Sequence, residues 1–313
     1  MRLGGSGVAN NPIQVTEVTK RFGDVQALDG ISLSVARGEM FGLIGHNGAG
    51  KSTLFKLMLG LMPPTSGEIR VHDALTGGRG FRQARRRIGY LPESFVTYDN
   101  LTGLEVLRLF ADLKHVPRRE CEPILARVGL TDAAGRRVRG YSKGMRQRLG
   151  FAQVLLGSPD LLFLDEPTNG LDPEGIHDFY RILREVQAQG ATVIITSHIL
   201  AEIQERVDRL VILTAGRIAA QGTLSELRAQ VVLPSVIELG LHAGHGQRMH
   251  DALVHIAGIG VEIDEHYARI ECPQGHKLAV LSIVTGLAGA VHDIVVHEPS
   301  LEDVFLGYGG SHV

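Results

Sequence analysis

The segment GHNGAGKS at residues 45–52 constrains the fold of this 313-residue chain more than any other feature. It fits the pattern G-x-x-x-x-G-K-[ST], and it stands between the short apolar run 40–44 and the helical spacing of residues 51–61. Glycines let such a loop turn its backbone N–H groups inward, where they and the helix N-terminus bind phosphate groups. A chance glycine-rich turn would rarely carry these residues at these offsets. We therefore predict a nucleotide-binding loop.

Individual residues of this loop have distinct predicted roles. Lys51 is expected to reach the β- and γ-phosphates, Ser52 to bind Mg²⁺, and Thr53 to add a phosphate contact. The predicted nucleotide-contacting residues are Gly45, His46, Asn47, Gly48, Ala49, Gly50, Lys51, Ser52 and Thr53. The loop alone does not separate ATPases, GTPases and kinases. The guanine-selecting pattern Asn-Lys-x-Asp is absent from the sequence, which argues against a GTPase.

Two adjacent carboxylates end the apolar run 161–164. At the end of a strand, Asp165 can hold Mg²⁺ through its water shell, and Glu166 can face an attacking water as a general base. His198 follows the next apolar strand, so it can lie over the same pocket and contact the γ-phosphate. Alone, these residues would be read as solvated or structural. A phosphate loop in the same chain favours the catalytic interpretation.

The order of predicted elements indicates an α/β fold with a largely parallel sheet, because apolar strands alternate with helices. The predicted strands are 13–18, 31–35, 40–44, 67–71, 87–91, 161–165, 192–196, 209–213 and 217–221. Residues 23–30 are interpreted as a turn-bearing connection, and residues 102–157 as a mainly helical region. The helix after the phosphate loop is expected to include Leu61 on its apolar face.

A boundary is predicted at 231–235, after which the order of elements is β-α-β-β-α-β. This order suggests a small α+β, ferredoxin-like domain. The expected division is a flexible N-terminus (1–12), a nucleotide-binding domain (13–230) and an accessory domain (231–313), with a last short helix at 300–306.

Composition limits the possible partners. The formal net charge is −2, which gives no global argument for binding nucleic acid, and the basic run 85–87 is interpreted as a solvated face. Cys121 and Cys272 lie far apart and have no metal-type spacing. No signal pattern opens the sequence, and no run of about 18 apolar residues occurs. We therefore expect any membrane role to depend on a partner.

The segment YSKGMRQRLG at residues 141–150 indicates a second anion site. Ser142 and Gly144 precede a predicted helix, whose N-terminus exposes N–H donors. The chain already has a phosphate loop, so one interpretation is that this site completes a pocket on another subunit.

With these motifs in this order, residues 13–230 resemble the ATP-binding subunits of ABC transporters. The matching motifs are GHNGAGKST (Walker A), YSKGMRQRL (signature), LLFLDEP (Walker B), GLDP (D-loop) and His198 (switch histidine). The resemblance implies a P-loop NTPase of the ABC ATPase type, with a RecA-like α/β core, an antiparallel β subdomain and a helical signature subdomain. The signature departs from the family pattern at Lys143 and Met145.

The resemblance also implies ATP and Mg²⁺ as ligands and adds residues to the site. Asp172 of the D-loop is counted among the nucleotide-binding residues, together with Ser142 and Gly144. Phe22 stands where the family places an aromatic ring on adenine, although packing against a strand edge explains it equally well. In the family, two subunits sandwich two ATP molecules and drive membrane subunits. We therefore expect a homodimer, transmembrane permease subunits as partners, no nucleic acid, and a cytoplasmic location at the inner face of the cell membrane.

Glu93, which follows the run IGYLP, stands where the family usually has a glutamine. That residue reaches Mg²⁺ and the attacking water, and it begins a loop that faces the membrane subunit. A carboxylate can also ligate Mg²⁺, so Glu93 is predicted to be a metal ligand.

The C-terminal segment, with PSLEDVF at 299–305, resembles the subfamily that serves separate permeases, many of them exporters. The segments GHNGAGKS (with His46), RIGYLPES, YDNLTGLEVL and RVRGYSKGMRQRLG further resemble ATPases that help to mature the copper sites of nitrous oxide reductase. That interpretation adds a periplasmic partner reached through the permease. The alternatives are a drug, lipid or polysaccharide exporter, a soluble ABC ATPase, and a regulatory module that does not hydrolyse ATP.

Overall fold

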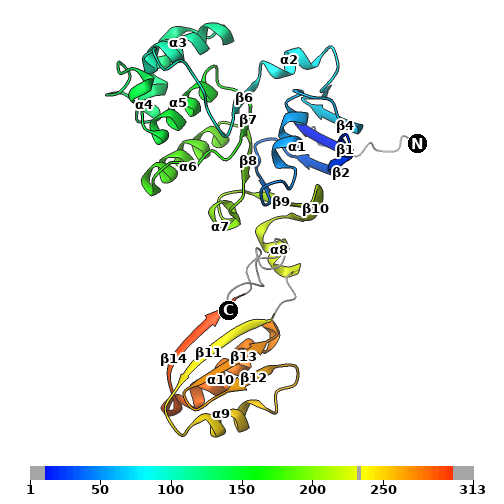
Figure 1. The fold of residues 1–313 in the computed structure, drawn as a ribbon, viewed down its shortest axis with the longest axis vertical. Coiled ribbons are helices and arrows are strands. Elements are labelled where there is room, and N and C mark those ends of the chain that lie inside the picture. Colours follow the sequence, from blue (N-terminus) through cyan, green and yellow to red (C-terminus); the bar gives the residue numbers. More distant parts are fainter. Residues whose placement is uncertain (1–10, 231–233, 299–313) are drawn as a thin grey trace, which may run out of the picture. The chain divides into compact units, whose positions relative to one another are not determined.

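The computed structural model describes residues 11–230 and 234–298. The chain forms two compact units that divide between Leu224 and Ser225, and each unit is described by itself (Figure 1). The short helix expected at 300–306 and residues 1–10 of the expected flexible N-terminus lie outside the described residues.

The first unit contains a four-stranded sheet with the order β2-β1-β4-β5. Its strands are β1 (Ile13–Phe22), β2 (Val25–Val35), β4 (Ser66–Val71) and β5 (Ala74–Leu75), and all neighbouring pairs are antiparallel. The prediction that 23–30 is a connection was largely wrong. Phe22 pairs with Val25 across a two-residue turn in which Gly23 has a φ of 56°, so the strand resumes at once.

A six-stranded sheet with the order β10-β9-β3-β8-β7-β6 forms the centre of the same unit. Its strands are β3 (Met40–Ile44), β6 (Ile88–Leu91), β7 (Leu161–Leu164), β8 (Thr192–Ser197), β9 (Arg209–Thr214) and β10 (Arg217–Gly222). All neighbouring pairs except β9–β10 are parallel, which confirms the predicted α/β architecture. The carboxyl ends of the five parallel strands therefore meet at one edge, where α/β sheets bind ligands.

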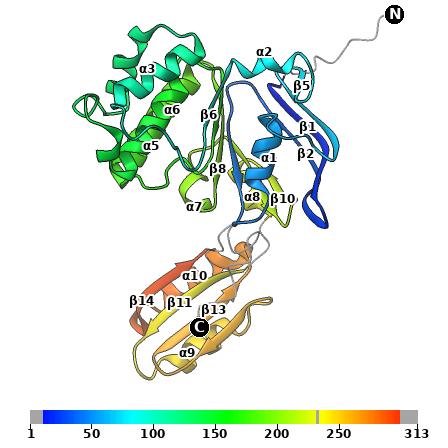
Figure 2. The same ribbon diagram turned by 45° about the horizontal axis from the view of Figure 1, so that its top comes forward.

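Helices flank this sheet in two groups. Figure 2 shows α3, α5 and α6 on one side of β6, and α1 with β1 and β2 on the other. The α-helices of the first unit are α1 (Lys51–Met58), α2 (Phe81–Arg85), α3 (Gly103–Lys114), α4 (Cys121–Arg127), α5 (Lys143–Leu155), α6 (Pro173–Ala188) and α7 (Leu200–Ile203). Short 3₁₀ turns occupy Arg118–Glu120 and Val138–Gly140. Helix α8 (Leu224–Gln230) starts at the division between the units.

Helix α1 is shorter than predicted. It ends at Met58, and Gly60 follows with a φ of 61°, so Leu61 leaves the apolar face and is 58% exposed. The rest of α1 packs as expected, because the ring of Phe55 meets that of Phe163 on β7 edge to face, with centroids 5.4 Å apart.

The second unit has the predicted element order. It contains β11 (Ser235–Leu241), α9 (Gly246–Leu253), β12 (Gly260–Ile263), β13 (Tyr267–Cys272), α10 (Lys277–Gly286) and β14 (Val291–His297), with 3₁₀ turns at Gln274–His276 and Ala288–Ala290. The strands form an antiparallel sheet with the order β12-β13-β11-β14, as in a ferredoxin-like fold. Residues such as Ile237, Leu239 and Ile270 form its buried core with both helices. Across both units, no helix in the described residues has the length and apolar character needed to span a membrane.

Candidate active site

The phosphate loop joins β3 to α1 and depends on glycine at two points of close approach. A Cβ atom on Gly45 would lie 2.4 Å from the carbonyl oxygen of Leu213. Gly50 has a φ of 105°, and a Cβ atom there would lie 2.8 Å from the carbonyl oxygen of Ala27. Side chains at either position would collide with backbone, so the loop conformation requires these glycines.

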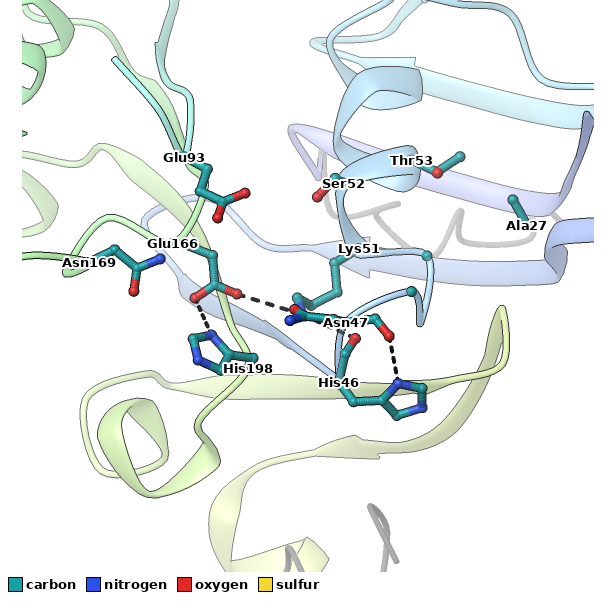
Figure 3. A pocket seen from close by; sticks show the side chains of 12 residues that line it. Ala27, His46, Asn47, Lys51, Ser52, Thr53, Glu93, Glu166, Asn169 and His198 are labelled. Atoms are coloured by element: carbon teal, nitrogen blue, oxygen red, sulfur yellow. Dashed lines mark hydrogen bonds and ion pairs between the residues drawn. The ribbon is translucent and has the colours of Figure 1, made fainter. Parts of the chain in front are cut away.

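This loop opens onto a cavity at the carboxyl ends of the parallel strands. Figure 3 shows Lys51 and Ser52 on one side of it, with Glu93 and Glu166 on the other. The lining residues are Ala27, His46, Asn47, Gly48, Gly50, Lys51, Ser52, Thr53, Glu93, Glu166, Asn169 and His198. The structure thus brings together the predicted phosphate loop, base, switch histidine and Glu93. Ala27 and Asn169 were not predicted.

Lys51 is a buried cation with three oxygen contacts. Its Nζ donates to the carbonyl oxygens of Gly45 and, at 3.4 Å, of His46, and it lies 3.6 Å from Oε1 of Glu166. The ammonium group is therefore held at the floor of the phosphate loop, and it balances the charge of the carboxylate opposite.

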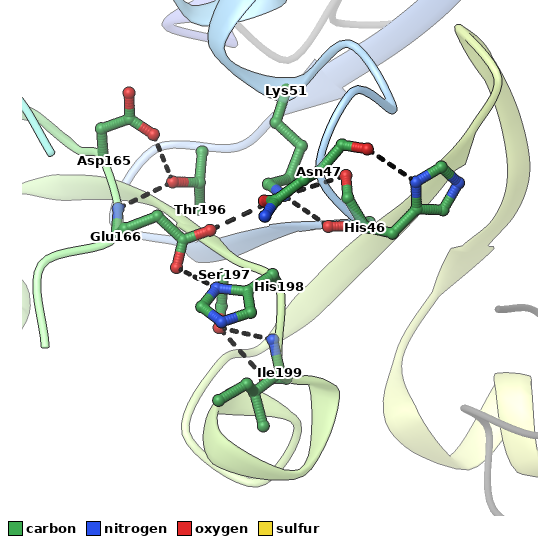
Figure 4. Close-up of polar contacts among 10 residues, drawn as sticks. His46, Asn47, Lys51, Asp165, Glu166, Thr196, Ser197, His198 and Ile199 are labelled. Carbon is green, nitrogen blue, oxygen red and sulfur yellow. Dashed lines mark hydrogen bonds and ion pairs between the residues drawn. The ribbon is translucent and has the colours of Figure 1, made fainter. Parts of the chain in front are cut away.

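Glu166 is held by contacts with two residues at the end of β8, Thr196 and His198. Its Oε2 lies 2.8 Å from Nδ1 of His198, and its backbone N–H donates to Oγ1 of Thr196 at 2.8 Å (Figure 4). Glu166 also has a φ of 46°, a strained conformation for a residue other than glycine. The carboxylate is thus fixed in direction, which suits a group that must orient a water molecule.

Asp165 is buried directly beside this pair. It accepts a hydrogen bond of 2.6 Å from the hydroxyl of Thr196, and its backbone N–H donates to the carbonyl oxygen of Leu91. Burial raises the pKa of the Asp165 carboxyl, and the charges of Glu166 and Glu93 raise it further. Since a cation would relieve this cost, and carboxylate and hydroxyl oxygens are the ligands Mg²⁺ prefers, the residues Asp165, Ser52 and Glu93 fit a magnesium ion.

Sequence reasoning missed Thr196, although it touches both acidic residues. A threonine inside the otherwise apolar run of β8 was the available signal, because a buried hydroxyl needs a hydrogen-bond partner.

A second cavity lies beside the start of α5. Its lining residues are Gly129, Leu130, Asp132, Ala133, Ser142, Lys143, Gly144, Met145, Arg148, Gly170, Leu171 and Asp172. The side chain of Ser142 caps α5 by accepting from the N–H of Met145, and Asp172 caps α6 by accepting from the N–H of Gly175. This cavity shares no lining residue with the first. Within one chain, Ser142, Gly144 and Asp172 therefore stand apart from the phosphate loop.

One buried side chain connects the two regions. Nε2 of Gln147 on α5 donates to the carbonyl oxygen of Pro167 at 2.8 Å, and this proline follows Glu166 directly. This hydrogen bond ties α5 to the loop that carries the carboxylate. No pattern in the sequence predicted this contact.

Comparison with known proteins identifies the family. A family model described as "ABC transporter" matches residues 28–169. The daunorubicin resistance ATP-binding protein DrrA3 of Streptomyces coeruleorubidus is 36% identical over 320 residues, which cover 97% of this chain and 97% of that protein. The chain belongs to the ABC transporter family, as an ATP-binding subunit.

Further similarities support this assignment of the ABC subunit. The Nod factor export ATP-binding protein I of Rhizobium meliloti (strain 1021) is 36% identical over 306 residues, covering 95% of this chain and 88% of that protein. A solved structure of an ATP-binding subunit of an ABC transporter is 36% identical, with a TM-score of 0.65, covering 70% of this chain and 92% of that one. ABC subunits of this kind bind ATP with Mg²⁺, hydrolyse it, dimerise and act with membrane permeases.

Four predicted site residues line neither cavity: Phe22, Gly45, Ala49 and Asp165. Phe22 ends β1, is 47% exposed, and has Nζ of Lys20 5.1 Å from the centre of its ring. Ala27 of β2 lines the cavity of the ABC subunit, whereas Phe22 does not. Adenine stacking on Phe22 therefore stays a prediction.

Proposed function

We propose that this ABC subunit powers a separate membrane permease that exports a drug, lipid or polysaccharide. The observation that carries the proposal is the likeness, over nearly the whole chain, to proteins named for daunorubicin resistance and Nod factor export. These relatives match the second unit as well as the ATPase, so the likeness extends beyond the motifs of nucleotide binding. We place the subunit at the cytoplasmic face of the cell membrane, where its permease would hold it.

The two separate cavities support a homodimer. Each is a partial anion site: one has the phosphate loop, and the other has Ser142 and Gly144 at the N-terminus of the 13-residue helix α5. In our proposal, ATP lies between the phosphate loop of one copy and Ser142 of the other. Asp172, beside Ser142, would approach the same nucleotide across the interface.

The contacts of Glu166 support its role as the base. Oε of Glu166 would accept a proton from the water that attacks the γ-phosphorus, while the bond from that phosphorus to the bridging oxygen of ADP breaks. His198 would keep the carboxylate oriented through its 2.8 Å contact. Lys51, now paired with carbonyl oxygens and Glu166, would turn its charge toward the β- and γ-phosphates.

Asp165, Ser52 and Glu93 would hold the magnesium ion, which when bound neutralises charge on the phosphates. Burial raises the pKa of the Asp165 carboxyl, so a nearby cation would stabilise its ionised form. The Thr196 hydroxyl would hold Oδ1 of Asp165 in place, and Oδ2 of Asp165 would be available to the water shell of the metal.

The central test combines a dimer assay with purification of partners. Glu166→Gln keeps the shape of the side chain but removes the base, so it should trap an ATP-bound dimer that is visible by size exclusion. Glu262→Gln, an exposed position on β12, makes the same change of charge and should not trap it. A Glu166→Gln protein that stays monomeric with ATP would overturn the hydrolytic assignment. Failure to copurify a polytopic membrane protein would instead favour a soluble ABC ATPase or a regulatory module.

A second candidate is the ATPase NosF of the complex that helps to mature the copper sites of nitrous oxide reductase. The segments RIGYLPES, YDNLTGLEVL and RVRGYSKGMRQRLG favour it, and it would add a periplasmic partner through the permease. Deletion of the gene separates the candidates. Loss of copper from nitrous oxide reductase would support this candidate, whereas sensitivity to a drug or retention of a cell-surface product would support the exporter.

A further inference from the structure

Five arginines gather in nine residues around α2, although the chain as a whole has a formal net charge of −2. They are Arg79, Arg82, Arg85, Arg86 and Arg87, and all are exposed. The surrounding segment 74–92 contains no aspartate or glutamate. The positive charge is therefore concentrated locally.

The fold anchors α2 by its apolar face and turns arginines outward. Phe81 and Ala84 are buried, and the Phe81 ring packs so closely on Gly60 that a Cβ atom there would lie 2.4 Å from it. Arg85 lies over this ring and donates to the carbonyl oxygen of Gly60 at 3.1 Å. The helix is thus fixed to the residues that follow α1, while Arg82 within the helix and Arg86 directly after it are exposed.

Three of these arginines have no protein partner within the described residues. Arg87 pairs with Asp160, and Arg85 donates to Gly60, but no ion pair or side-chain hydrogen bond holds Arg79, Arg82 or Arg86 in residues 11–230 and 234–298. Their guanidinium groups are free to meet a diffuse negative surface.

Two exposed leucines flank these cations. Leu61 is 58% exposed and follows Gly60, the residue on which α2 packs. Leu75 is 42% exposed, and its carbonyl oxygen accepts from the N–H of Gly78 in the turn that leads into α2. We call the surface made by Leu61, Leu75, Arg79, Arg82 and Arg86 the basic patch.

We propose that the basic patch binds anionic phospholipid headgroups of the membrane that carries the permease. Long cationic side chains beside isolated apolar ones suit the boundary between headgroups and acyl chains, where charge attraction and shallow apolar burial act together. Arg79, Arg82 and Arg86 are not held in a fixed geometry by protein partners within the described residues, and such mobile cations suit a diffuse layer of headgroup charge. The proposal rests on the proposed function for the presence of that membrane.

Flotation with vesicles tests the proposal directly. The wild-type protein should float with vesicles of phosphatidylcholine and phosphatidylglycerol, less so at high salt, and weakly with phosphatidylcholine alone. The variant Arg79→Gln/Arg82→Gln/Arg86→Gln should bind the anionic vesicles about tenfold more weakly or worse. Leu61→Ser/Leu75→Ser should lose part of the binding that remains at high salt.

A matched control changes three other exposed arginines. Arg119→Gln/Arg228→Gln/Arg248→Gln alters the net charge equally and should bind anionic vesicles within about twofold of wild type. Equal flotation of the two triple variants would overturn the proposal. So would normal vesicle binding by the patch variant together with loss of permease copurification, since that result assigns the patch to an acidic segment of the permease. ATP hydrolysis in solution and the Glu166→Gln dimer do not depend on the patch, so failure here leaves the proposed function standing.

Discussion

The hydroxyl of Thr196 donates a 2.6 Å hydrogen bond to Oδ1 of Asp165, and Oγ1 of Thr196 also accepts from the backbone N–H of Glu166. One side chain on β8 therefore positions both acidic residues that end β7. Backbone pairing of the two parallel strands fixes this relationship, since Leu164 lies opposite Ile195.

We expect Thr196→Val to lower the rate of ATP hydrolysis by about tenfold or more. A hydrogen bond to a charged group contributes about 1.5–3 kcal/mol. Its loss would let the Asp165 carboxylate rotate, and the N–H of Glu166 would lose its acceptor. Steady-state hydrolysis with Mg²⁺ measures the effect, and Thr196→Ser should retain most of the activity. Thr192→Val is the matched control, because Thr192 is equally buried on β8 but accepts from the N–H of Gly38. It should lose stability and keep its rate per folded molecule; a normal rate in Thr196→Val would refute the positioning role.

Thr196→Val should also move the acidic limb of the pH–rate profile to higher pH. The Thr196 hydroxyl lowers the pKa of Asp165 and so opposes the rise caused by burial. Without it, the carboxyl would stay protonated to a higher pH, and a protonated carboxyl binds Mg²⁺ poorly. Profiles of hydrolysis at fixed Mg²⁺ concentration measure the shift, and raising the Mg²⁺ concentration should reverse part of it. An unchanged acidic limb would show that Asp165 does not control the reaction at low pH.

His72 makes a separate prediction about stability. Burial, followed by the charges of Arg87 and Arg37, lowers the pKa of His72 from 6.5 to about 4, and Oδ1 of Asp160, 3.1 Å from its Nε2, opposes this shift. Between these values the unfolded chain binds a proton that the folded chain does not, so stability should fall as the pH falls from 6.5 to 4. The shift corresponds to at most about 3 kcal/mol. Denaturant unfolding across this range should show a smaller fall for His72→Asn, since asparagine tolerates the φ of 48° at this position.

The control for His72 is another histidine with the same backbone conformation. His115 has a φ of 57° but is exposed at the end of α3. His115→Asn should leave the acid dependence of stability as it is in the wild type. If both variants changed it equally, burial of His72 would not be its source.

Local patterns predicted the parts of this molecule that depend on neighbouring residues. The phosphate loop, the buried strands β3, β7 and β8, and the order of elements in the second unit all followed from motif spacing or short apolar runs. The hairpin of β1 and β2 did not, because residues 25–30 are partly polar and become strand only through pairing with β1. The prediction that Leu61 lies on the apolar face of the helix was wrong for the opposite reason. Its spacing was helical, but the helix had already ended before Gly60.

The site residues divide in the same way, into those that local patterns predicted and those that depend on contacts across the fold. Glu93, Glu166 and His198 reach one cavity because parallel strands end at one edge of the sheet. Contacts made across the fold could not be predicted, and Gln147 with Pro167 is the clearest case, since helix α5 must first dock before that amide meets the carbonyl. Thr196 lies between the two cases: its type gave a signal, but its partners required the strand order.

Glu93 lies where the nucleotide cavity meets a loop tied to the start of α5. It lines the cavity directly after β6, and its charge raises the pKa of Asp165. Farther along the same loop, Asp99 pairs with Arg146 of α5 at 2.7 Å, and its carbonyl oxygen accepts from the N–H of Arg139. These contacts join the loop that begins at Glu93 to α5 and to the turn that precedes Ser142.

We expect Glu93→Gln to hydrolyse ATP at close to the wild-type rate, because an amide oxygen can replace a carboxylate oxygen at Mg²⁺. Glu93→Ala removes that oxygen, so permease-stimulated hydrolysis should fall several-fold more than hydrolysis by the isolated subunit. Both rates are measured with and without the copurified permease in vesicles. Glu122→Ala, at an exposed position on α4, serves as the control for loss of a surface carboxylate and should match wild type in both assays. Severe and equal loss in Glu93→Gln and Glu93→Ala would show instead that the reaction requires the negative charge itself.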